Sequence, residues 1–134
     1  MDLEINPHYP LIVTVAALVV YFISILLVGR ARSKYKVDPP ATTGPEAFNR
    51  SFRQQQNMME QLILFLPAMW VYAWYNSPEW AAGIGTVWVL ARLAYSFAYI
   101  ASAPKRFIPF IISVAATLVL LVGGIMGAVQ SLMN

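Results

Sequence analysis

The stretch RSFRQQQNMMEQLILFLPAMWVYAWY, residues 50–75, joins two segments of opposite character. Two arginines, an asparagine, a glutamate and four glutamines stand ahead of a run that is apolar and aromatic. A helix from about Thr43 to Tyr75 is roughly 48 Å long and exceeds a hydrocarbon core of about 30 Å. We therefore expect its polar N-terminal third to project beyond the acyl chains and to serve a function.

Composition places the chain among membrane proteins. Of its 134 residues, 59% are hydrophobic and 11% are charged, whereas soluble domains carry about 25% charged residues. The length predicts one domain over residues 1–134. The absence of cysteine excludes disulfides and thiolate metal sites, and a single histidine argues against a histidine-rich metal site, so we expect no metal. The net charge of +3 comes without a basic tract interleaved with aromatics, so no nucleic-acid partner is expected.

Hydropathy predicts an all-α fold, a bundle of four transmembrane helices. Each apolar segment is near the roughly 20 residues that a spanning helix needs. The expected helices cover residues 9–29, 43–75, 79–102 and 104–132, and the first continues into RARSKYK. Pro39-Pro40 cannot continue a helix and ends the first one.

Local signals mark the remaining boundaries. Thr43 and Glu46 have the spacing of a capping box at the start of the second helix. Pro78 is well placed as the first residue of the third helix, and Pro104 opens the fourth. The glycines of GGIMG, residues 123–127, have a G-x-x-x-G spacing that favours close helix packing.

Basic residues lie on one side of the predicted bundle. The chain has nine, and all except Arg92 are at or near the first-to-second and third-to-fourth connections. These two connections share one side of a four-span bundle. By the positive-inside rule that side is cytoplasmic, which predicts an integral, multi-pass membrane protein.

Two polar stripes follow from helical spacing, because residues three and four apart share a face. The first comprises Arg50, Arg53, Asn57 and Glu60, and the second Arg92, Tyr95, Tyr99 and Ser102. Taken singly, Arg92 and Glu60 could be an internal ion pair, and the tyrosines could be interfacial aromatics. Together the residues favour a polar ligand site. Guanidiniums suit carboxylates or phosphates, and a carboxylate among them suits a ligand cation, so a small zwitterion with more than one carboxylate fits.

The segments PPATTGPEAFNRSFRQQQNMMEQ and ARLAYSFAYIASAPKRF resemble the MAPEG family, the membrane-associated proteins of eicosanoid and glutathione metabolism. The resemblance covers nearly the whole chain. It implies a homotrimer of four-helix protomers that hold glutathione between neighbours near the cytoplasmic face. The glutathione site it implies comprises Arg32 from the adjacent protomer, Arg53, Gln55, Asn57, Glu60, Tyr95, Tyr99 and Arg106. Arg106 is the expected catalytic residue and would hold the thiolate.

The implied activity is that of a glutathione transferase or peroxidase acting on lipophilic electrophiles or lipid hydroperoxides that arrive from the bilayer. Gln61 and Ser33 replace residues of the leukotriene-forming branch, so that activity is not expected. Two alternatives stay open. One is a non-catalytic lipid-binding or scaffolding member of the same fold, and the other is a small proton-coupled exporter using Glu60. Both a bacterial inner membrane and the endoplasmic reticulum agree with the sequence.

Overall fold

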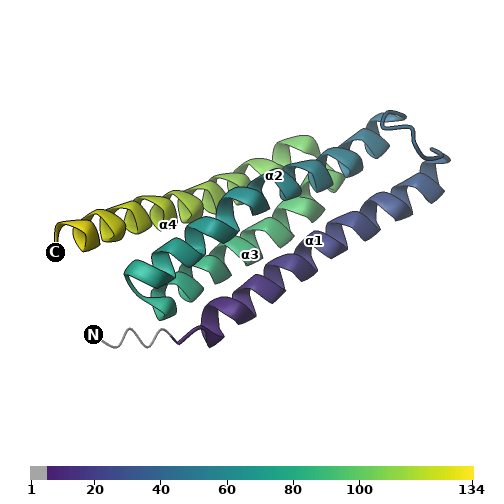
Figure 1. Ribbon diagram of the computed structural model, residues 1–134. Coiled ribbons are helices and arrows are strands. Elements are labelled where there is room, and N and C mark those ends of the chain that lie inside the picture. The colour runs from purple at the N-terminus through teal and green to yellow at the C-terminus, as the bar shows by residue number, and fades with distance from the viewer. Residues whose placement is uncertain (1–5) are drawn as a thin grey trace.

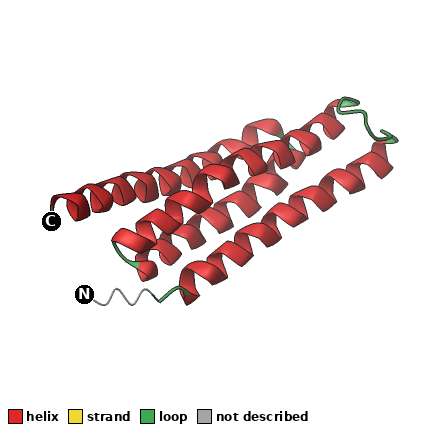
Figure 2. Ribbon diagram, viewed as in Figure 1, coloured by secondary structure: helices red, strands yellow, loops and turns green. Residues whose placement is uncertain are grey.

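Four long helices and one 3-10 turn make up residues 6–134, the part of the chain that the computed structural model describes. They are α1 His8–Tyr35, α2 Glu46–Tyr75, α3 Pro78–Ala101, the 3-10 turn η1 Ala103–Arg106, and α4 Phe107–Met133. Figure 2 shows helices joined by short loops, without a strand in these residues. The prediction of an all-α fold is therefore confirmed.

The helices run side by side along one common direction (Figure 1). α2 and α3 each contact all three other helices, whereas α1 and α4 flank them. The α1–α2 linker and the turn between α3 and α4 lie at one end of the bundle, and α4 ends at the other. The two basic connections thus share one end, as predicted.

Three segments are long and apolar enough to cross a membrane, namely α1, α3 and the continuous stretch from Ala103 to Met133. α2 does not reach the same hydropathy, although it is the longest helix at 30 residues. Its first half carries Arg50, Arg53 and Glu60, which leaves the apolar part from Leu62 onward too short to span alone.

The start of α2 corrects the predicted capping box. The helix begins at Glu46, and its N-terminus has no side-chain cap. Pro45 has φ −53° and ψ 153°, an extended conformation that ends the linker two residues later than the capping box requires. Asn49 instead accepts a hydrogen bond from the Gly44 N–H at 2.9 Å and donates to the Gly44 carbonyl at 3.1 Å. Glu46 forms an ion pair with Arg50, at 3.3 Å.

The structure confirms the predicted start of the third helix but not that of the fourth. Pro78 is the first residue of α3, as predicted, and the Ser77 hydroxyl caps this helix by accepting from the Trp80 N–H at 3.2 Å. Pro104, which was predicted to open the fourth helix, lies within η1 instead. The α-helix starts only at Phe107, after a tight turn that places Arg106 between α3 and α4.

Large apolar side chains occupy both the interior and the outer surface. In the core, the rings of Phe65 on α2 and Trp88 on α3 are stacked with centroids 3.9 Å apart. On the outside, α1 exposes residues such as Phe22 and Leu26, and α4 exposes Leu118 and Met126. A helix that is apolar on every side is typical of a membrane span.

Two glycines allow α4 to approach α2 closely, as the G-x-x-x-G spacing predicts. A Cβ at Gly123 would lie 2.5 Å from the Tyr72 ring, and one at Gly127 would lie 2.8 Å from Cβ of Tyr75. The Tyr75 Cβ is attached directly to the α2 backbone, so it cannot move aside as a flexible side chain can. Gly127 is therefore the position where α4 tolerates a side chain least.

We expect Gly127→Ala to lower the thermal midpoint of the purified protein by several degrees. Forcing a methyl group into a packed contact costs about 1–3 kcal/mol. Gly83→Ala is the matched control, because a Cβ at Gly83 meets no atom of residues 6–134 within 4 Å and alanine favours the helix. Equal midpoints for both variants, measured by circular dichroism in one detergent, would show that α2 and α4 are not tightly packed at Gly127.

Candidate functional site

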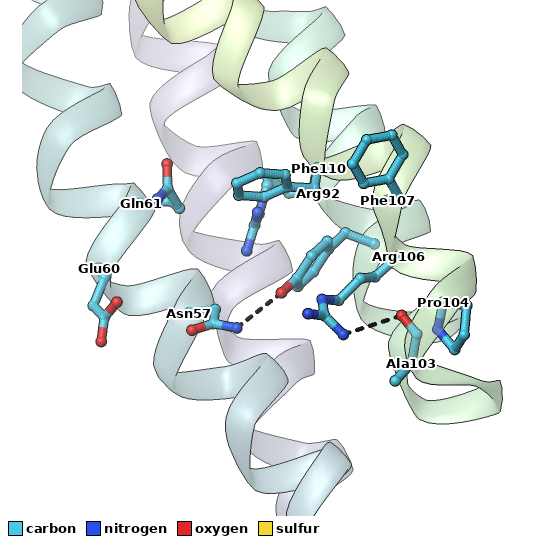
Figure 3. Close-up of a pocket in the computed structure, with 10 residues that line it drawn as sticks. Asn57, Glu60, Gln61, Arg92, Ala103, Pro104, Arg106, Phe107 and Phe110 are labelled. Carbon is cyan, nitrogen blue, oxygen red and sulfur yellow. Dashed lines mark hydrogen bonds between the residues drawn. The ribbon is translucent and has the colours of Figure 1, made fainter.

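A cavity of about 460 Å³ lies between α2, α3 and the start of α4, near the basic end of the bundle. Figure 3 shows the side chains that surround it. They are Asn57, Glu60 and Gln61 from α2, Arg92 and Tyr95 from α3, Ala103, Pro104 and Arg106 from η1, and Phe107 and Phe110 from α4. Two guanidiniums, one carboxylate, two amides and a phenol therefore face the same space as two phenylalanine rings.

A hydrogen bond closes the wall between α2 and α3. The amide nitrogen of Asn57 donates to the Tyr95 hydroxyl oxygen at 2.8 Å. Tyr95 is 2% exposed, so its ring is held by packing and its hydroxyl by Asn57. The phenol keeps its own O–H proton available, because in this bond it only accepts.

Arginines and tyrosines alternate along this wall. The Arg92 guanidinium lies over the Tyr95 ring at 3.9 Å from its centroid, and the Arg106 guanidinium lies over the Tyr99 ring at 4.7 Å. The two tyrosine rings meet edge to face with centroids 5.6 Å apart. Cation–π contacts of this kind favour fixed guanidinium positions. One arginine thus stands at each end of the tyrosine pair.

Arg106 owes its position to the turn that carries it. It is the last residue of η1, is partly buried, and donates from Nη1 to the Ala103 carbonyl at 3.1 Å. The turn reverses the chain between α3 and α4 and brings the guanidinium back over α3. A cation is thereby held at the cavity (Figure 3).

The structure brings only part of the predicted glutathione set together. Asn57, Glu60, Tyr95 and Arg106 line the cavity. Tyr99 does not line it and is buried in contact with Tyr95 and Arg106. The cavity therefore holds polar residues that α2, α3 and η1 contribute.

Three further residues of the predicted set do not line this cavity in the single chain. Arg53 borders a separate space of about 370 Å³ beside the linker. Gln55 points toward α1 and donates to the Tyr21 hydroxyl at 3.1 Å. Arg32 donates to the Ala41 carbonyl at 2.8 Å and lies over the Phe48 ring.

The possible ion pair between Arg92 and Glu60 is not formed. Within residues 6–134 there is one ion pair, between Arg50 and Glu46. Arg92 belonged to the second polar stripe but was not among the residues assigned to the glutathione site, yet it lines the cavity. An arginine in the middle of an apolar helix was the available signal, since such residues usually mark a partner or a cavity. Across the same described range, histidine, aspartate and glutamate form no group of three or more that could hold a metal ion.

Comparison with known proteins supports the resemblance. Residues 10–126 match the MAPEG family. An uncharacterised protein of Synechocystis is 41% identical over 124 residues, which is 92% of this chain and 90% of the relative. Microsomal glutathione S-transferase 2 of Mus musculus is 38% identical over 107 residues, 80% of this chain and 73% of the relative. Leukotriene C4 synthase of Cavia porcellus is 42% identical over 96 residues, 72% of this chain and 64% of the relative. The chain therefore belongs to the MAPEG family.

Proposed function

We propose that the protein is a membrane-embedded glutathione transferase, with glutathione peroxidase activity in its range, and that the cavity beside Arg106 is its glutathione site. The observation that carries this proposal is the union of two guanidiniums, a carboxylate and hydrogen-bonding side chains in one interhelical cavity. The likeness to a microsomal glutathione S-transferase and a leukotriene C4 synthase supports it.

Glutathione matches the charges of the cavity. The tripeptide carries two carboxylates, one ammonium and a thiol. Arginines bind carboxylates through paired, charge-assisted hydrogen bonds, and the Glu60 carboxylate offers a partner for the ammonium. Asn57 and Tyr95 would position the peptide, and Arg106 would hold the sulfur.

A homotrimer would account for the residues that lie outside the cavity of their own chain. Arg32 would reach the site from the adjacent protomer, and Arg53 and Gln55 would lie along the same seam. Arg53 is exposed and borders a second polar space, so it is accessible to a ligand or a neighbouring chain.

All four helices are proposed to cross the membrane, α2 included, because α2 packs between the other three. Its polar N-terminal turns would emerge at the basic end, on the cytoplasmic side. The polar cavity would then open near the cytoplasmic surface of a bacterial inner membrane or of the endoplasmic reticulum.

The proposed chemistry is thiolate activation. A free thiol has a pKa near 8.5 and is mostly protonated at neutral pH. Lowering that pKa by about two units requires roughly 2.7 kcal/mol of differential stabilisation. A preorganised guanidinium in a partly dry site can supply this amount. The thiolate would then attack a lipophilic electrophile or a lipid hydroperoxide that enters from the bilayer.

The test is ultraviolet difference absorbance of the purified protein in detergent at neutral pH as glutathione is added. We expect a saturable thiolate band, and S-methylglutathione, which has no ionisable thiol, should occupy the site without producing it. Saturable binding without a band or turnover would favour the lipid-binding or scaffolding alternative. Proton-driven cation uptake by proteoliposomes, abolished by Glu60→Gln, would instead indicate an exporter.

A further inference from the structure

Arg92 is a buried cation. Its side chain is 0% exposed, and in the described part of the chain Nε and Nη2 have no hydrogen-bond partner. The third nitrogen, Nη1, donates only to the Ser113 hydroxyl, at 3.5 Å. Within residues 6–134, no carboxylate oxygen lies within 4.0 Å of the guanidinium.

Burying the Arg92 guanidinium in this way raises the free energy of the folded protein unless a ligand supplies the missing hydrogen-bond acceptors. Burying a charge without a partner is expensive, and buried polar groups are nearly always hydrogen-bonded. The contact with the Tyr95 ring offsets only part of the cost. Arg92 lines the cavity, but neighbouring side chains cover its two unpartnered nitrogens, so a ligand oxygen reaches them when those neighbours shift (Figure 3).

Arg92 and Arg106 lie at different depths in the bundle. Arg92 stands nine residues before the end of α3 at Ala101, about 14 Å along the helix, whereas Arg106 follows that end. The Tyr95–Tyr99 pair separates the two guanidiniums. The side chains of Phe107 and Phe110 line the same cavity and give it an apolar wall suited to a lipophilic acceptor.

We propose that Arg92 is a second catalytic residue, which donates hydrogen bonds to the oxygen that leaves the acceptor. This inference rests on the proposed function, with the glutathione sulfur at Arg106. In a displacement the attacking and leaving atoms lie on opposite sides of the atom under attack. Two guanidiniums at opposite ends of the tyrosine pair match that requirement. The acceptors that Arg92 serves are therefore those with an oxygen leaving group, such as hydroperoxides and epoxides.

With a hydroperoxide, the thiolate sulfur attacks the terminal oxygen. The S–O bond forms, the O–O bond breaks, and its electron pair goes to the inner oxygen as an alkoxide, which Arg92 stabilises. The alkoxide takes a proton from water and leaves as an alcohol, and the proton released when the thiol ionised neutralises the hydroxide. Glutathione sulfenic acid then reacts with a second glutathione to give the disulfide and water. Sulfur is oxidised and the peroxide is reduced, by two electrons each.

The experiment compares two acceptors in the full-length protein. Cumene hydroperoxide loses an oxygen anion that needs a donor, whereas 4-nitrobenzyl chloride loses chloride. We expect Arg92→Met to lower kcat for the hydroperoxide by about 10²-fold and for the chloride by less than about threefold, since one oxyanion donor contributes about 10²–10³. The thiolate band should be unchanged. Arg92→Lys, which keeps the charge without the planar fork, should fall between Arg92→Met and wild type.

Arg30→Met is the matched control, because Arg30 is exposed on α1 and does not line the cavity. Equal losses on both acceptors would overturn the inference and make Arg92 a packing residue. Loss of the thiolate band would also overturn it and assign Arg92 to glutathione. If Arg92→Met does not fold, an unchanged ratio of the two activities in Arg92→Lys overturns it. Wild-type protein without a thiolate band or any turnover would instead refute the proposed function, and this inference with it.

Discussion

Arg106→Ala is expected to remove the thiolate band at neutral pH and to lower turnover with every acceptor. Without the guanidinium the pKa of the bound thiol should rise by about two units, to near 8.5. The thiol pKa is lowered in the complex, so wild-type activity should persist as pH falls toward the lowered value. The variant should recover activity only as the pH rises toward the pKa of the free thiol.

The comparison is a pH titration of the glutathione difference spectrum from pH 5.5 to 9.5, with kcat measured at each pH. Lys105→Ala is the matched control, because Lys105 is a neighbouring cation on the same turn that is exposed and does not line the cavity. Of the two cations on this turn, Arg106 lies over the Tyr99 ring and lines the cavity, and Lys105 does neither. A wild-type titration curve in Arg106→Ala would remove Arg106 from thiolate activation.

Glu60→Gln is expected to raise KM for glutathione by about 10- to 100-fold, because a hydrogen bond to a charged group contributes about 1.5–3 kcal/mol. The proposed partner is the ammonium of the tripeptide. A glutathione analogue without that amino group, glutaryl-cysteinylglycine, cannot make the bond. Its KM should be similar in Glu60→Gln and wild type.

This pairing of variant and analogue separates a lost contact from general damage. Glu79→Gln serves as the control, because Glu79 is an exposed carboxylate in the first turn of α3, far from the cavity in the chain's fold. If Glu60→Gln weakens the binding of glutathione and of the analogue equally, Glu60 does not bind the ammonium.

The sequence predicted the helices well because apolar length and prolines are local signals. Pro78 marked the start of α3 correctly, and the glycines near residue 123 predicted close packing. The capping box failed because Pro45 holds the linker extended past Thr43. Thus the helices could be foreseen, while the residue at which each begins depended on backbone geometry.

The candidate site was predictable only where polar residues stood out against apolar surroundings. Asn57, Glu60 and Tyr95 do so, and they line one cavity. Arg106 lines it too, but it lies in a basic connection, and the family resemblance is what assigned it to the site. The phenylalanine wall could not be foreseen, since an apolar residue facing a cavity has the same sequence signature as one facing lipid. Gln55 was assigned to the glutathione site, yet in the single chain it faces α1. The direction of its side chain depends on how α1 and α2 are rotated against each other, which the sequence does not reveal.

The bundle also separates the cavity from its C-terminal end. α4 begins beside the cavity at Phe107 and runs 27 residues to Met133, about 40 Å in length. A fluorescent or affinity tag fused after Asn134 would therefore lie at the end of the bundle opposite the reacting groups (Figure 1). Such a fusion would report which way the protein is oriented in a vesicle while leaving the chemistry undisturbed.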